Sequence, residues 1–401
     1  MWHPWQLLQS LRRPARVLDK VTTTHHKVLD HVTATLTHNP LLFPQGFFAD
    51  GWGDLHVPTL LERRLATDDK FTVAPIHDLQ WTTVPRLPLR RANAPVVLQG
   101  SFRTTLREHE DLLPPVCHTA HCELVLPADM MPHDAAAPIQ GQGRALVLIL
   151  PGTGEHGCTH RRKNVAEPLA RAGVATLVLE GPFYGKRKPE KQRGSKLRRV
   201  SDLPILGIAT IEEAKSLLHH CKQHYNFDHL VVAGGGSMGG LHAAMTAALF
   251  PGDVGVASWV APPSAIPAFT RGLLALSCNW QSLAQQRELA MIDQLLAGHV
   301  AHYADLPPTD EVAHVKQRLS AFLALTNIEN FPTPRRDDAV VFSQASEDQY
   351  IGANEAQWQL VRARWPRAQF RRVTAGHVSG ILFETEAFVA TILDIIQTLR
   401  R

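Results

Sequence analysis

The 401-residue chain is predicted to fold as an α/β protein, with a mostly parallel central sheet flanked by helices. From residue 144 onward, short apolar runs rich in Val, Leu and Ile alternate with segments that have helical periodicity. Strands and helices at this spacing imply right-handed crossovers between parallel strands. Because 44% of the residues are hydrophobic, the chain also has enough apolar side chains for a sizeable core.

The individual elements are predicted from these runs and from the residues that end them. One helix is expected at 165–172, where Gly173 ends it, and another at 202–224, where Asp202 is a suitable cap. A third is expected at 241–249 and a last one at 384–400. The expected strands are 122–127, 144–150, 174–180, 230–233, 255–260, 339–344 and 370–373.

The chain is expected to divide into an N-terminal extension, residues 1–115, and a main domain, residues 116–401. The extension is rich in Pro, His, Thr and Arg and has weak helical periodicity, so we expect it to pack over the main domain. Between residues 262 and 334 the strand–helix alternation gives way to a mixed helical segment. We expect this insertion to form a helical lid over a site.

The strongest chemical signal lies between residues 230 and 249. An apolar, strand-like run ends in Gly-Gly-Gly-Ser-Met-Gly-Gly at 234–240, and a helix-forming segment follows at once. This is the strand–turn–helix setting in which Gly-x-Ser-x-Gly forms a nucleophile elbow. The pattern therefore predicts that Ser237 is a nucleophile on a strained turn, with an ordinary glycine-rich turn as the alternative.

A serine nucleophile needs a base, and the base needs an acid that orients it. Asp348 follows the expected strand 339–344 and His377 follows the expected strand 370–373, in the order serine, acid, histidine that such an elbow predicts. Both residues would reach Ser237 from loops at the carboxyl ends of late strands. Glu347 is the competing acid, but neighbours in an extended loop point in opposite directions.

The oxyanion that forms during acyl transfer needs preorganised hydrogen-bond donors. The backbone N–H of Met238, directly after the serine, is the expected first donor. The second is expected from the glycine-rich segment at 151–156, with Thr153 as the first choice and Gly154 as the second. A tight turn without a ligand is the alternative interpretation of this segment.

A basic run at 186–199 follows an apolar turn at 182–185, and Glu190 is the only acid in it. We expect this run to steer or hold an anionic substrate or an anionic membrane surface, with a solvated loop as the alternative. The residues expected to bind substrate at the rim of the site are Phe183, Tyr184, Lys186 and Arg187.

Charge and cysteine content narrow the classes of partner and ligand. A net charge of +4 does not by itself indicate a nucleic-acid-binding protein, and no nucleic-acid partner is expected. Five cysteines without a Cys-x-x-Cys pair favour reduced thiols in an intracellular protein. Cys117, His118, His121 and Cys122 are spaced too tightly for the usual zinc sites, so neither a metal nor another cofactor is expected.

The first residues indicate a targeting or membrane-surface segment. Residues 1–17 contain three arginines and no acid, and apolar residues recur every three positions from Trp2 to Leu11. This pattern is typical of an organelle transit peptide, such as a mitochondrial one, or of an anchor at a membrane surface. An amphipathic helix docked on the domain is the alternative. No apolar run approaches the length that crosses a bilayer.

Several further motifs accompany the elbow. They are Phe-Ala-Asp-Gly-Trp-Gly at 48–53, Pro-Gly-Thr-Gly-Glu-His at 151–156, Leu-Glu-Gly-Pro-Phe-Tyr-Gly-Lys-Arg-Lys-Pro at 179–189, Val-Ser-Asp-Leu at 200–203, Glu-Asp-Gln-Tyr-Ile at 347–351 and Gly-His-Val-Ser at 376–379. From about Phe48 to the C-terminus, the chain resembles the α/β-hydrolase domain-containing protein 18 family. The resemblance implies an α/β-hydrolase fold and a triad of Ser237, Asp348 and His377.

The predicted function is a serine hydrolase that cleaves a carboxylic ester through an acyl-enzyme. The expected substrate is an acyl-bearing lipid such as a phospholipid, because of the basic run, the Trp-bearing N-terminus and the expected lid. Two alternatives stay open: a non-catalytic protein of the same fold that binds a lipid or a partner, and an acyltransferase that passes the acyl group to an acceptor other than water.

Overall fold

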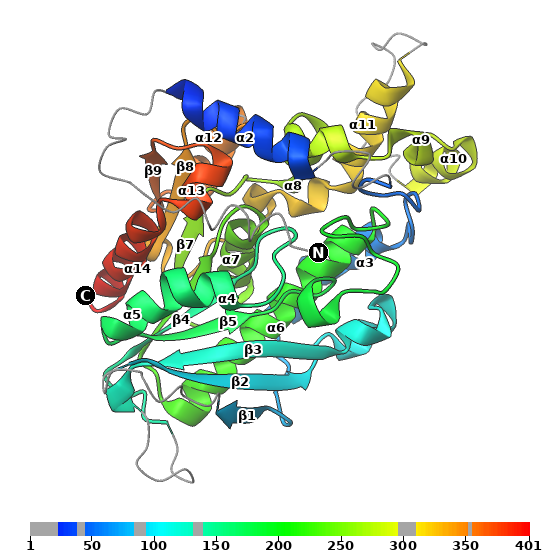
Figure 1. The fold of residues 1–401 in the computed structure, drawn as a ribbon. Coiled ribbons are helices and arrows are strands. Elements are labelled where there is room, and N and C mark those ends of the chain that lie inside the picture. Colours follow the sequence, from blue (N-terminus) through cyan, green and yellow to red (C-terminus); the bar gives the residue numbers. More distant parts are fainter. Residues whose placement is uncertain (1–22, 38–44, 84–93, 131–138, 296–309, 352–354) are drawn as a thin grey trace.

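The computed structural model describes residues 23–37, 45–83, 94–130, 139–295, 310–351 and 355–401. Its centre is a nine-stranded sheet in the order β1-β2-β3-β5-β4-β6-β7-β8-β9 (Figure 1). The strands are β1 (Gln80–Thr83), β2 (Val96–Arg103), β3 (Thr119–Leu126), β4 (Ala145–Leu150), β5 (Ala175–Leu179), β6 (His229–Gly234), β7 (Gly255–Trp259), β8 (Val340–Ala345) and β9 (Gln369–Val373).

The part of the sheet whose strands are followed by the loops of the candidate site is parallel. Strands β5, β4, β6, β7, β8 and β9 run parallel, whereas β1, β2 and β3 form antiparallel pairs and β3 joins β5 antiparallel. Every residue of β4, Ala-Leu-Val-Leu-Ile-Leu, is buried, as expected of a parallel strand covered on both faces. The predicted α/β fold with a mostly parallel sheet is confirmed.

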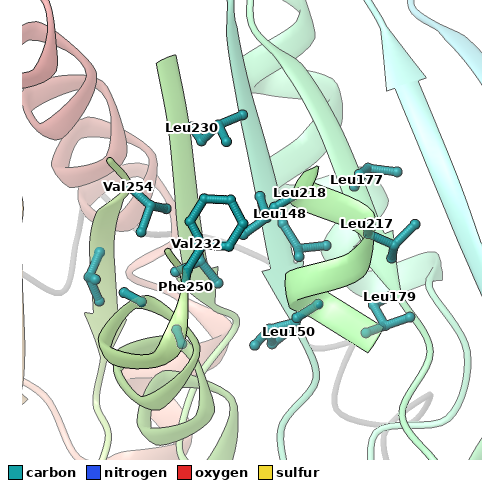
Figure 2. Close-up of a cluster of buried hydrophobic side chains, with 14 of the residues drawn as sticks. Leu148, Leu150, Leu177, Leu179, Leu217, Leu218, Leu230, Val232, Phe250 and Val254 are labelled. Atoms are coloured by element: carbon teal, nitrogen blue, oxygen red, sulfur yellow. The ribbon is translucent and has the colours of Figure 1, made fainter. Parts of the chain in front are cut away.

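Helices cover both faces of the sheet. Those on one face are α6 (Asp202–Tyr225), α7 (Met238–Leu249) and α12 (Glu355–Arg364). Those on the other are α4 (Thr159–Arg161), a π-helical turn (Arg162–Ala166), α5 (Glu167–Arg171) and α14 (Thr385–Leu399). Figure 2 shows the first layer of the core, where Leu217 and Leu218 of α6 meet strand residues such as Leu148 and Leu177.

Further helices lie beyond these two layers. They are α2 (Thr23–Thr37), α3 (Val57–Ala66), α8 (Ala265–Thr270), α9 (Trp280–Leu283), α10 (Gln286–Leu295), α11 (Glu311–Phe322) and α13 (His377–Leu382). Short 3₁₀ helices are η1 (Asp68–Phe71), η2 (Arg107–Leu112), η3 (Pro115–Cys117), η4 (Ala128–Met130), η6 (Gly185–Arg187), η7 (Leu273–Ser277), η9 (Ala324–Thr326), η10 (Ile328–Asn330) and η11 (Asp337–Ala339). Within the described ranges, no helix combines the length and the apolar character needed to cross a membrane.

The N-terminal part of the chain is built into the sheet. Strands β1 and β2 both precede residue 115, and β2 pairs with β3 along its whole length. The expected boundary at residue 115 therefore falls inside one sheet. The described part of the insertion 262–334 is helical, from α8 to η10. The predicted amphipathic segment at 1–17 lies outside the described residues.

Candidate active site

Ser237 sits on a sharp turn between β6 and α7. Its backbone angles, φ 54° and ψ −127°, belong to a region that a residue other than glycine occupies only under strain. The turn is tight because the glycines around it allow close approach: a Cβ on Gly239 would lie 2.7 Å from the carbonyl oxygen of Leu150. A Cβ on Gly234 would overlap the backbone of Gly240. The local sequence thus places Ser237 at the N-terminus of α7.

Asp348 and His377 come together from two loops. Asp348 follows β8, and His377 is the first residue of α13, after β9. The His377 ring nitrogen Nδ1 lies 2.6 Å from Asp348 Oδ2, and both side chains are buried. The other Asp348 oxygen accepts the backbone N–H groups of Tyr350 and Ile351 at 2.9 and 3.0 Å. Glu347 instead pairs with Lys27 at 3.3 Å, so the histidine's partner is Asp348.

The surroundings of His377 favour its protonated form. Burial acts to lower the pKa of His377, but the Asp348 carboxylate, its hydrogen bond and the nearby Asp30 carboxylate outweigh burial. The pKa therefore lies above its ordinary value of 6.5. A neutral imidazole held by a buried carboxylate becomes a stronger base, since the imidazolium that it forms is stabilised in place.

Ser237 and His377 line one cavity of about 360 Å³. Gly152 and Thr153, from the loop after β4, form part of its wall. Since β4, β6, β8 and β9 are parallel, the loops at their carboxyl ends meet at the same edge of the sheet. The cavity also has apolar lining residues, among them Phe47, Leu274 and Ile381. From the insertion, the described lining includes Leu274.

Two backbone N–H groups predicted as oxyanion donors are those of Met238, directly after Ser237, and Thr153, which lines the cavity. Neither the Met238 nor the Thr153 N–H has a hydrogen-bond acceptor among the described residues, and the Met238 N–H opens the first turn of α7. The Gly154 N–H is engaged with the hydroxyl oxygen of Tyr184. The geometry thus favours Thr153 over Gly154 as the second donor.

The loop that carries Thr153 is held by an ion pair that no sequence pattern indicated. Glu155 accepts the Gly152 N–H through Oε2 at 3.2 Å and the Arg161 Nε–H through Oε1 at 2.9 Å. Arg161 is buried and also donates to the carbonyl oxygens of Ile149 and Leu179, at the ends of β4 and β5. This ion pair fixes the donor loop to the sheet. The only signal for this ion pair in the sequence is an acidic residue two positions after Thr153.

The residues expected to bind substrate lie elsewhere, and this corrects the prediction. Phe183, Tyr184, Lys186 and Arg187 do not line the cavity. The Arg187 side chain is fully buried and forms an ion pair with Glu213, at 2.6 Å, that joins the turn to α6. Burial in such a pair satisfies the guanidinium and removes it from any substrate. Phe183 and Tyr184 are buried packing residues, while Lys186 is exposed.

The basic run is only partly a charged surface. Lys196 is buried, with its Nζ 4.5 Å from the centroid of the Phe47 ring, and burial lowers its pKa to about 7. Arg198 pairs with Asp50. Among the closely spaced Cys and His residues at 117–122, Cys117 donates its thiol to the Arg187 carbonyl oxygen at 3.1 Å. The described part of the chain contains no group of three His, Cys, Asp or Glu side chains placed to hold a metal ion.

Helix α2 is the second feature that no sequence pattern predicted. Thr33 and Thr37 of this helix line the cavity, and Asp30 reaches the loops of Asp348 and His377. The only signal in the sequence is that polar residues recur at 26, 30, 33 and 37, on one helical face.

Several solved structures match this chain at low sequence identity. The Pyrococcus furiosus esterase Pf2001 is 14% identical over 70% of this chain and 87% of that chain, with a TM-score of 0.42. Brefeldin A esterase, a bacterial homologue of human hormone sensitive lipase, is 12% identical over 86% of each chain, with a TM-score of 0.41. TT1662 from Thermus thermophilus is 15% identical over 69% and 94%, with a TM-score of 0.40.

The family comparison covers most of the chain. Residues 45–398 match the family described as alpha/beta hydrolase domain containing 18. The match spans the sheet from β1 to β9, the elbow and both loops that carry Asp348 and His377, and it begins after α2. The chain therefore belongs to the alpha/beta hydrolase domain containing 18 family.

Proposed function

We propose that this chain is a serine hydrolase that cleaves a carboxylic ester in an acyl-bearing lipid such as a phospholipid. The observation that carries the proposal is the 2.6 Å contact between Asp348 and His377, at the cavity that His377 shares with Ser237. A strained serine, a histidine and an orienting acid are what acyl transfer to a hydroxyl requires.

In the first half of the reaction, the Ser237 hydroxyl attacks the ester carbonyl carbon and His377 Nε2 takes its proton. Asp348 holds the Nδ1–H and stabilises the imidazolium. The oxyanion is held by the N–H groups of Met238 and Thr153, aided by the positive end of α7. The intermediate collapses, the C–O ester bond breaks, and His377 gives the proton to the departing alcohol.

In the second half, water attacks the acyl-enzyme. His377 takes a proton from the water and returns one to Ser237 Oγ, which releases the carboxylic acid and restores the serine. An alcohol could attack in place of water, so acyl transfer differs from hydrolysis only in the acceptor.

A lipid substrate is supported by apolar side chains in the catalytic cavity and by a second, apolar cavity that Met238 lines. Phe47, Leu274 and Ile381 line the catalytic cavity. A second, almost wholly apolar cavity of about 60 Å³ lies between α3, α6 and α7, with Met238 in its wall. Met238 Sδ is 3.5 Å from the hydroxyl oxygen of Thr153, which lines the catalytic cavity, so the two spaces lie on either side of this contact. An acyl chain gains free energy from such burial.

The test is active-site labelling with a fluorophosphonate, followed by hydrolysis of esters that differ in chain length and head group. The folded parent should be labelled on Ser237, and Ser237→Ala should lose labelling and lower kcat by about 10⁴- to 10⁶-fold. A folded parent that is not labelled would favour the binding protein of the same fold. Product analysis with competing alcohols separates hydrolysis from acyl transfer.

A further inference from the structure

Helix α2 carries its polar face inward. His26, Asp30, Thr33 and Thr37 are spaced by four, three and four residues, so they share one face of the helix, and Asp30 and Thr33 are only 0% and 3% exposed. Three large apolar side chains that recur every four residues are instead exposed to solvent. They are Val28, Val32 and Leu36. A helix that only covered a core would have the opposite arrangement.

The Asp30 carboxylate joins the two loops of the histidine and its acid. Oδ2 accepts the backbone N–H of Gln349, next to Asp348, at 3.0 Å and the N–H of His377 at 2.9 Å. Oδ1 accepts the N–H of Val378 at 2.9 Å. One buried carboxylate thus makes three hydrogen bonds, which involve a neighbour of the acid, the histidine itself and the residue after it. Charge-assisted bonds of this kind are stronger than neutral ones.

Other contacts fix α2 on the same loops. His26 Nδ1 lies 2.9 Å from Ser379 Oγ, which itself accepts the Gly376 N–H at 2.8 Å. A Cβ on Gly376 would lie 2.8 Å from the His26 carbonyl oxygen, so glycine is what lets the helix approach. Ala34 belongs to a small apolar cluster with Val378 of α13, and Figure 1 shows α2 lying across α13.

Thr33 lines the catalytic cavity, and its hydroxyl oxygen is buried without a hydrogen-bond partner among the described residues. The hydroxyls of Thr35 and Thr37 bond the carbonyl oxygens four residues earlier, at 2.8 Å each. Since Thr33 lines the cavity together with Ser237 and His377, a substrate oxygen or N–H could satisfy its hydroxyl, and an unsatisfied buried hydroxyl is costly.

We propose that α2 is a working part of the active site, in which Asp30 positions the loops of Asp348 and His377 and the Thr33 hydroxyl binds substrate. This inference rests on the proposed hydrolase function. Asp30 is a positioning residue, because it touches backbone N–H groups and not the reacting atoms. Thr33 marks a subsite for a polar group of the ester substrate, in the cavity that it shares with Ser237 and His377.

The charges around His377 make the proposal testable by pH. Two carboxylates face the histidine, Asp348 from the loop after β8 and Asp30 from α2, and both raise its pKa. The Tyr350 ring stacks on the imidazole, with centroids 5.1 Å apart. Exposed Lys27 pairs with partly buried Glu347 at the edge of the same loops. Removing the Asp30 charge should therefore lower the pKa of His377 and leave the other groups in place.

The first experiment compares Asp30→Asn with Lys27→Met, a matched control on the exposed side of α2. Asn cannot accept all three N–H groups, so the loops should shift and kcat should fall roughly 10- to 100-fold. The acidic limb of the profile of kcat/KM against pH should also move to lower pH. Lys27→Met should keep the parental kcat and profile. An Asp30→Asn protein with parental kcat and an unmoved acidic limb overturns the positioning role.

A charge-conserving variant covers the case in which Asp30→Asn fails to fold. Asp30→Glu keeps the charge but displaces it by one methylene group, so kcat should fall while the acidic limb stays near the parental pH. A parental kcat in Asp30→Glu overturns the positioning role. Circular dichroism and thermal unfolding establish that the variants compared are folded.

The second experiment concerns Thr33. Thr33→Val is nearly isosteric and removes only the hydroxyl, so KM should rise about 2- to 10-fold with little change in kcat. The control is Thr35→Val, at an exposed position on the same helix. A parental KM in Thr33→Val, for every ester that the parent hydrolyses, overturns the subsite.

The labelling experiment separates this inference from the proposed function. If the folded parent does not react with the fluorophosphonate, the proposed function fails and this inference fails with it. If the parent reacts and Asp30→Asn reacts at the same rate with the same pH dependence, only the role of α2 fails.

Discussion

The two halves of the candidate active site are built in different ways. The nucleophile half is local, since backbone strain at Ser237 and glycines within a few residues of it form the elbow. The histidine half is assembled from distant segments, because Asp348 is 29 residues from His377 and Asp30 is 347 residues away. The difference teaches that a short motif can specify a nucleophile, whereas the base is held by side chains that only the fold brings together.

The largest effect should come from breaking the histidine half at its acid. Asp348→Asn should preserve folding but favour the wrong imidazole tautomer, so kcat should fall by about 10⁴-fold. Glu347→Gln is the matched control, since its carboxylate contacts the exposed Lys27 and not the histidine, and its kcat should be close to parental. Steady-state kinetics on one soluble ester compares the two. Reversed results would mean that Glu347 is the acid.

A smaller effect should come from loosening the nucleophile half. Glu155→Gln loses the charge that pairs with buried Arg161, so the loop of Thr153 should move and kcat should fall roughly 10- to 100-fold. KM should change less, because the oxyanion donors act mainly in the transition state. Glu167→Gln removes a carboxylate that pairs with the exposed Arg171 and serves as the control. Equal activity of both variants would show that this ion pair does not support catalysis.

The basic run at 186–199 lies outside both halves, so changes to its exposed charges should leave the chemistry of the site unaffected. We propose that the exposed charges of the basic run contact an anionic lipid surface. Replacing Lys186, Lys191 and Arg193 by Gln should weaken binding to anionic vesicles by up to about 3 kcal/mol. Salt should reduce this loss, because exposed charges are screened over about 8 Å. Small-ester turnover should not change, and Lys196→Met, at a buried position, should bind vesicles as the parent does.

Unchanged vesicle binding in the triple variant would identify the run as a solvated loop. Loss of small-ester turnover in that variant would instead show that these residues support the structure of the site.

The smallest expected effect concerns the histidine half: the rise of kcat/KM with pH should be displaced to higher pH than an ordinary histidine would give. His377 acts as a base only when neutral, and its neighbours raise its pKa above 6.5. The rate should therefore rise with pH through a pKa higher than 6.5 and fall short of half its plateau at pH 6.5. Measurement of kcat/KM against pH on a non-ionising ester checks this. A profile that is already flat at pH 6.5 would contradict the role of His377.

Sequence patterns located most of the parallel sheet but missed its N-terminal edge. Strands β4, β5, β6 and β7 are buried on both faces, so each is a continuous apolar run that the sequence alone identifies as a strand. Strand β2 escaped because Gly100 interrupts it. In the fold, that glycine leaves room for the ring of Trp81, a contact that no local pattern reveals.

The same contrast applies to the site. The sequence was enough to propose Ser237, Asp348 and His377, because glycine spacing and the order of strands can be recognised in the sequence itself. Helix α2 could not, because its apolar residues Val28 and Val32 face solvent and its polar face is turned toward the site. Arg187 was misassigned for a related reason. A basic residue in a basic run is ordinarily exposed, but its partner Glu213 lies on another element and compensates for its burial.

The hydrogen bond between Asp30 and His377 also bears on how the protein folds. It spans 347 positions of the chain, and closing so long a loop is entropically slow and happens after local structure has formed. During synthesis α2 emerges early, yet its carboxylate has no partners until both late loops have been made. The elbow can form as soon as β6 and α7 exist. His377, in contrast, is not held by Asp30 until both late loops have been made. A partly synthesised chain would thus carry the proposed nucleophile, Ser237, before the proposed base, His377, is held in place.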